Sequence, residues 1–115
     1  MGSMLAVVNS DRKQDAIANL LNGQNHWIGL YKDPEDTSNW LWVDQSQFCS
    51  GLWSAGEPNN LGGHEDCVEM RPAHSGLWND APCSLNRRYV CEMNGWFNSF
   101  VNRSVIFASH QTKES

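Results

Sequence analysis

The chain has 115 residues and a formal net charge of −5, and this length predicts one domain with one core. The acidic balance, without any basic run, argues against a nucleic-acid partner and against binding to an anionic membrane surface. No stretch reaches the roughly 18 apolar residues that a membrane span needs, so we expect no membrane insertion.

The first predicted elements are a strand and a helix. The apolar run Met4–Val8 predicts a short buried strand. Ser10 is a typical helix N-cap and Gly23 a typical left-handed stop, so we expect a helix over about residues 11–22. The apolar face of this helix would consist of Ala16, Ile17, Leu20 and Leu21.

Further strands are expected where aromatic and β-branched residues concentrate. These runs are residues 27–31, 40–43, 67–70 and 88–93. Residues 44–66 form a long polar segment without periodicity, and long loops of this kind are usually functional or disordered. Residues 76–83 are expected to form a shorter loop. For residues 94–115 a poorly ordered tail is favoured over an added helix or strand, because no clear period emerges.

Four cysteines, Cys49, Cys67, Cys83 and Cys91, allow three pairings. None of their spacings has the two-residue gap of zinc ribbons, so disulfides are favoured over zinc. Disulfides imply an oxidising compartment, and the protein is therefore expected to be secreted or extracellular.

Hard oxygen donors gather in two parts of the chain. Glu57-Pro58-Asn59 places a carboxylate and an amide around a proline, and a cis bond before Pro58 would aim both side chains at one point. Glu65 follows across two glycines that let the chain turn back, and Trp78-Asn79-Asp80 adds another amide and another carboxylate. Carboxylates and amides without thiolates or imidazoles favour Ca²⁺. The predicted metal ligands are Glu57, Asn59, Glu65, Asn79 and Asp80.

Five segments, in this order, resemble the signature of the C-type lectin domain family. They are Trp27–Leu30, Gly56–Asn60, Glu65–Cys67, Trp78–Asp80 and Tyr89–Glu92. The resemblance implies an α+β fold over residues 5–93, with a helix packed on small antiparallel β-sheets and a long calcium-binding loop. Residues 1–4 would then be a start or expression remnant, and residues 94–115 a C-terminal tail of unknown role.

The resemblance also implies what the domain binds. In this family the Glu-Pro-Asn form accompanies mannose, fucose, glucose and N-acetylglucosamine, whose hydroxyls coordinate the calcium ion directly, whereas Gln-Pro-Asp in the same place accompanies galactose. The five calcium ligands would therefore also be the carbohydrate-binding residues, and the partners would be mannose-type glycans or glycoproteins. An oligomer would raise the avidity of such shallow sites.

Other features implied by the resemblance are a Cys67–Cys83 disulfide and a second calcium ion. Candidate ligands for that ion are Asp33, Asn60, Glu65 and Asp66. The family's first strand, first helix and their cysteine would precede Leu5 and are missing, so Cys91 lacks its usual partner. Cys49 could pair with Cys91, link two chains or remain a thiol.

Several alternatives stay open at this point. His64 adjoins Glu65 and could contact a sugar, although a solvated side chain is favoured. Trp53 could stack on a sugar, although a core ring that anchors the loop is favoured. No nucleophile–histidine arrangement stands out, so an enzyme is not expected. The rival functions are a module of this family that binds protein or ice, and a truncated fragment without function.

Overall fold

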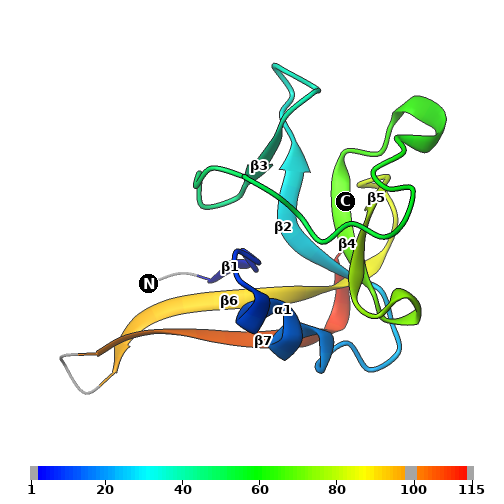
Figure 1. Ribbon diagram of the computed structural model, residues 1–115. Coiled ribbons are helices and arrows are strands. Elements are labelled where there is room, and N and C mark those ends of the chain that lie inside the picture. Colours follow the sequence, from blue (N-terminus) through cyan, green and yellow to red (C-terminus); the bar gives the residue numbers. More distant parts are fainter. Residues whose placement is uncertain (1–2, 98–100, 114–115) are drawn as a thin grey trace.

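The computed structural model describes residues 3–97 and 101–113, in which one α-helix accompanies a seven-stranded mixed sheet (Figure 1). The helix α1 spans Asp11–Ala18, and the strands are β1 (Ser3–Leu5), β2 (His26–Lys32), β3 (Trp40–Trp42), β4 (Cys67–Arg71), β5 (Leu77–Ala81), β6 (Arg87–Phe97) and β7 (Val101–Lys113). Two short 3₁₀ turns, η1 (Leu61–Gly63) and η2 (Pro72–His74), complete the list.

The sheet runs in the order β1-β6-β2-β4-β5, with β3 paired to β2 and β7 paired to β6. The predicted α+β class is confirmed. The predicted small antiparallel sheets are instead one sheet, because β2 and β6 pair in parallel at His26↔Arg88 and Trp27↔Tyr89.

The helix begins as predicted and ends early. The Ser10 hydroxyl accepts a hydrogen bond from the backbone N–H of Lys13, which is the expected N-cap contact. The last helical residue is Ala18, because Asn22 joins Gly23 in the left-handed region and the chain has already turned. Of the predicted apolar face, only Ile17 and Leu21 are buried; Ala16 and Leu20 are exposed.

Tryptophan rings join the sheet to the long loop. Trp78 of β5 is 1% exposed, and its ring meets those of Trp42 and Trp53 edge-on at centroid distances of 5.7 and 5.8 Å. The indole N–H of Trp78 also donates to Gln14 of α1. Trp53 packs on Trp40 as well, so its favoured interpretation as a loop-anchoring ring is confirmed.

Strand β5 lies where a loop was predicted. Its residues Trp78, Asn79 and Asp80 include two poor strand formers, which is why the sequence suggested a loop. Pairing with β4 overrides that preference, in an unbroken register from Cys67↔Ala81 to Arg71↔Leu77. The hairpin places two of the predicted ligands on a strand, which is a firmer support than a loop.

The prediction of a poorly ordered tail is wrong for residues 101–113. Strand β6 continues to Phe97, and β7 pairs with it antiparallel from Phe97↔Val101 to Arg87↔Lys113. Cys91 pairs with Leu5 of β1 and also with Phe107 of β7, so β7 covers the edge of β6 opposite β1. The rest of the predicted tail, residues 98–100 and 114–115, lies outside the described residues.

In the described part of the chain, no helix has the length and apolar character required to cross a membrane.

Candidate metal centre

The carboxylate of Asp80 connects β5 to the Glu-Pro-Asn turn. Asp80 is completely buried, and its two oxygens accept hydrogen bonds from the backbone N–H groups of Asn59 (3.1 Å) and Asn60 (2.7 Å). The bond between Glu57 and Pro58 is cis, the form that the sequence left open. The strand thus fixes the position of the turn that carries two predicted ligands.

Glu65 closes the other side of this turn. Its side chain is 8% exposed and accepts a hydrogen bond from the backbone N–H of Leu61, while its own N–H donates to Asn60 Oδ1. Between them Gly62 and Gly63 have φ values of 77° and 82°, which side-chain-bearing residues rarely adopt. The predicted return of the chain across these glycines is confirmed.

Glu57 lies against the same group of acids. Its side chain is 13% exposed, and its Oε1 atom has no hydrogen-bond partner among the described residues. Burial, the neighbouring Asp80 carboxyl and Glu65 together raise the pKa of Glu57, against a weaker opposing effect of Arg71. Arg71 approaches to only 4.0 Å, so the partly buried carboxylate of Glu57 is left with little compensation.

This unpaired oxygen is the observation that makes the residues fit calcium. A buried polar atom without a partner is costly, and a divalent cation would satisfy it and offset the repulsion among three carboxylates. In residues 3–97 and 101–113, however, no three His, Cys, Asp or Glu side chains are grouped closely enough to hold a metal ion. Calcium binding therefore requires the carboxylates of Glu57, Glu65 and Asp80 to turn toward a common point.

The side chain of Asn79 makes a separate contact. Because neighbouring residues of a strand leave it on opposite faces, Asn79 lies on the same face as its register partner Glu69, and Trp78 and Asp80 lie on the other face. The Nδ2 atom of Asn79 donates to Glu69 of β4 at 2.9 Å. The structure thus brings Glu57, Asn59, Glu65 and Asp80 together and places Asn79 beside Glu69, so Asn79 can join the same ion only through its Oδ1 atom.

Two of the four residues proposed for a second calcium ion lie beside a lysine. Lys32 Nζ donates to Asn60 Oδ1 at 3.0 Å and lies 3.6 Å from Asp66 Oδ1, above the ring of Trp40. The carboxylate of Asp33 accepts the backbone N–H of Glu35 and so caps its own turn. A positive charge therefore already occupies the space between two of the four candidate ligands.

Several residues that make these contacts could not be recognised from the sequence. The sequence did not single out four charged residues, because the partner of each lies far away along the chain. They are Lys32, Glu69, Arg71 and Arg87. Glu69 gave no usable signal, because a charged residue between the apolar residues Val68 and Met70 is what an alternating strand with one solvated face would show. His64, which could have contacted a sugar, is exposed.

The predicted disulfide between Cys67 and Cys83 is present. It joins the start of β4 to the segment after β5, and closing this loop should constrain the unfolded chain. Cys49 and Cys91 are both free thiols in the described part of the chain. The alternative in which these two cysteines pair is therefore not observed.

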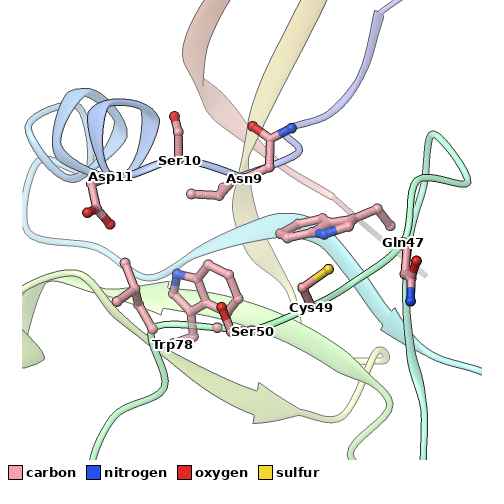
Figure 2. Close-up of a pocket in the computed structure, with 11 residues that line it drawn as sticks. Asn9, Ser10, Asp11, Gln47, Cys49, Ser50 and Trp78 are labelled. Atoms are coloured by element: carbon pink, nitrogen blue, oxygen red, sulfur yellow. The ribbon is translucent and has the colours of Figure 1, made fainter.

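A cavity of about 230 Å³ lies apart from these ligands, between the start of α1 and the long loop. Asn9, Ser10 and Asp11 line one side, with Cys49 and Ser50 opposite (Figure 2). None of the residues that line it belongs to the predicted ligand set.

Comparison with known proteins matches residues 1–93 to the family model described as Lectin C-type domain. C-type lectin domain family 4 member G of Mus musculus is 37% identical over 94 residues, covering 79% of this chain and 31% of the relative. Hepatic lectin of Gallus gallus is 38% identical over 94 residues, covering 80% of this chain and 44% of the relative. The chain therefore spans less than half the length of these two relatives.

Comparison with solved structures agrees with the match to the family model. The C-type lectin CEL-I from Cucumaria echinata has a TM-score of 0.71 at 31% identity, covering 77% of this chain and 66% of that one. The cow carbohydrate-recognition domain of CD23, solved in the presence of a GlcNAc2Man3 oligosaccharide, has a TM-score of 0.64 at 36% identity, covering 70% of this chain and 60% of that one.

Proposed function

The chain belongs to the C-type lectin domain family, and from this membership we propose that it binds mannose-type sugars through one calcium ion. C-type lectin domains generally bind carbohydrate in a calcium-dependent way. The proposed ligands of the ion are Glu57, Asn59, Glu65, Asn79 and Asp80, which would also contact the sugar.

The observation that carries this proposal is the unpaired Oε1 atom of Glu57 beside two further carboxylates. A calcium ion would supply the missing partner, and it takes six to eight oxygen ligands. Vicinal sugar hydroxyls could complete that shell while donating hydrogen bonds to the carboxylates and accepting them from amide N–H groups.

One ion is proposed in preference to two. The Lys32 ammonium between Asn60 and Asp66 supplies a fixed positive charge where a second ion would need those oxygens. A calcium ion there would have to displace the lysine and meet its repulsion.

The mannose-type preference rests on the Glu57-Pro58-Asn59 order of acid and amide, and gains support from the CD23 domain solved in the presence of a mannose-containing oligosaccharide. The proposed partners are glycans or glycoproteins, with no catalytic turnover. A secreted or extracellular location is supported by the Cys67–Cys83 disulfide.

A glycan array with and without a calcium chelator tests this proposal. We expect signals on mannose-, fucose- or N-acetylglucosamine-terminated glycans that disappear with chelator. A blank array together with chelator-insensitive capture of a protein ligand would favour the non-sugar module of this family instead.

A further inference from the structure

The side chain of Asn79 is held by a charged pair that the proposed ligand set does not include. Glu69 of β4 stands opposite Asn79 of β5 in the register. Glu69 Oε2 accepts a hydrogen bond from Asn79 Nδ2, and Glu69 Oε1 accepts one from Arg87 Nε, both at 2.9 Å. The two oxygens of one carboxylate thus have separate donors.

The burial of Glu69 makes this arrangement significant. Its side chain is 4% exposed, whereas that of Arg87 is 31% exposed. A carboxylate so deeply buried is costly unless it is paired and hydrogen-bonded. Arg87 supplies the compensating charge, which leaves the second oxygen of Glu69 directed at the amide.

An asparagine can serve a calcium ion only through its amide oxygen. The two ends of an amide have nearly the same shape, so packing alone does not decide which end faces a metal. A carboxylate accepts and never donates, so only the NH₂ end of Asn79 can face Glu69. The Oδ1 end is therefore turned away from Glu69 and has no competing contact there.

We propose that Glu69, fixed by Arg87, is a positioning residue that keeps the Asn79 oxygen available for calcium. This inference rests on the proposed function, because it assigns Asn79 to the ion. Partners that orient metal ligands in other proteins typically change metal affinity by about 10–100-fold when they are removed.

The test is calorimetric calcium titration of wild type and of Glu69→Gln. Glutamine keeps the shape but has one oxygen for two donors, so its NH₂ group must face either Arg87 or Asn79. An NH₂ group facing the Arg87 guanidinium would set donor against donor, so the glutamine turns its oxygen to Arg87 and its NH₂ group to Asn79. Asn79 must then turn its amide oxygen toward the glutamine, and that oxygen is no longer available to calcium. We expect calcium affinity to fall about tenfold.

The double variant Glu69→Gln, Asn79→Asp separates positioning from a general structural role. An aspartate at 79 accepts from the Gln NH₂ group with one oxygen and offers the other to calcium. We expect the double variant to regain most of the calcium affinity that Glu69→Gln loses. No gain over the single variant would overturn the positioning role.

Glu92→Gln is the matched control. Like Glu69, Glu92 is deeply buried, with a side chain 3% exposed; it pairs with Lys13 at 2.7 Å and accepts a hydrogen bond from Val7 N–H. It contacts none of the proposed ligands. Its replacement should lower the melting temperature while leaving calcium affinity unchanged.

The outcomes distinguish the two proposals. Wild type that binds no calcium would overturn both, whereas calcium binding that is equally tight in wild type and Glu69→Gln would overturn the positioning role alone. If Glu69→Gln does not fold, the positioning role is tested in the wild type, by the rate at which the Asn79 side-chain NH₂ protons exchange with solvent. Slow exchange with and without calcium supports the proposal, and exchange as fast as that of exposed Asn19 contradicts it.

Discussion

Glu57 combines two properties that are unfavourable without a cation, namely burial of a carboxylate and closeness to two more carboxyl groups. Burial is the larger cause of its raised pKa, and Asp80 and Glu65 add to it. Natural sequences keep such unfavourable groups mainly at functional sites. At the scale of single residues, the calcium proposal therefore makes its sharpest predictions here.

Glu57→Gln should stabilise the calcium-free protein, because it removes a partly buried negative charge beside Asp80. Its melting temperature in chelator should rise by a few degrees, since about 1 kcal/mol corresponds to roughly 4–8 °C in domains of this size. The same variant should lose the stabilisation that calcium gives wild type. That stabilisation is about 1.4–2.7 kcal/mol at 10 mM calcium, if the Kd lies at roughly 10⁻⁴–10⁻³ M.

The control is Glu35→Gln, an exposed carboxylate whose side chain contacts none of the proposed ligands. It should change neither the melting temperature in chelator nor the response to calcium. A calcium response that persists in Glu57→Gln would show that this residue does not bind the ion.

The pKa of Glu57 predicts how stability depends on pH. Because its folded-state pKa is raised, the protonated carboxyl favours the folded state, and this contribution is complete below the ordinary value near 4.5. It is lost as pH rises through the raised pKa. Calcium competes with that proton, so the difference in melting temperature between calcium and chelator should be small at pH 4 and grow toward pH 7. A difference that does not change with pH would contradict this assignment.

At the scale of helices and strands, the sequence predicted the elements whose signals lie within a few neighbouring residues. Ser10 marked the start of α1, and the aromatic runs marked β2 and β3. The strand β5 was missed, because Asn79 and Asp80 favour turns and only the partner strand β4 holds them extended. The extension of β6 and the strand β7 were missed for the same reason, since their pairing joins residues that local periodicity does not connect.

The candidate site also contains residues that the sequence could identify and residues that it could not. The sequence predicted Glu57, Asn59, Glu65 and Asp80 as one set of oxygen donors, and the structure brings them near one another. Their binding of calcium stays a prediction. Glu69 and Lys32 could not be assigned a role, because their meaning depends on which strand or loop lies opposite. Contacts between distant segments are what the sequence alone does not supply.

Strand β7 should contribute to stability, and Ile106 tests this. Ile106 is partly buried and packs against the core cluster. Ile106→Ala should destabilise the protein by about 1–2 kcal/mol, below the usual range for fully buried isoleucine. Urea unfolding measures this, with Leu20→Ala as the control, because Leu20 is 40% exposed. Equal stability of the two variants would show that β7 does not support the fold.

At the scale of the whole molecule, hydrogen bonds and a disulfide connect the sheet, the long loop and the ligands. Trp78 anchors the loop through Trp53, Asp80 holds the Glu-Pro-Asn turn, and the Cys67–Cys83 bridge ties β4 to the segment after β5. The loop drawn in green in Figure 1 is therefore braced from β5.

Exchanging the acid and the amide of this turn should change the preferred sugar. Glu57→Gln combined with Asn59→Asp keeps the net charge but reverses the order of acceptors and donors offered to the sugar hydroxyls. We expect preference to move from mannose toward galactose on sugar columns with calcium. The pair Glu35→Gln, Asn86→Asp is the charge-matched control at exposed positions, and it should keep mannose preference. An exchanged site that still prefers mannose would contradict the role of this turn.

Calcium titration calorimetry with and without methyl α-mannoside tests the central claim most directly. If the sugar binds through the ion, mannoside must tighten calcium binding by the same factor by which calcium tightens mannoside binding. We predict one calcium ion per chain, tighter binding with mannoside, and no mannoside heat in chelator. Calcium affinity that is unchanged by mannoside, or mannoside binding that persists in chelator, would contradict the proposed function.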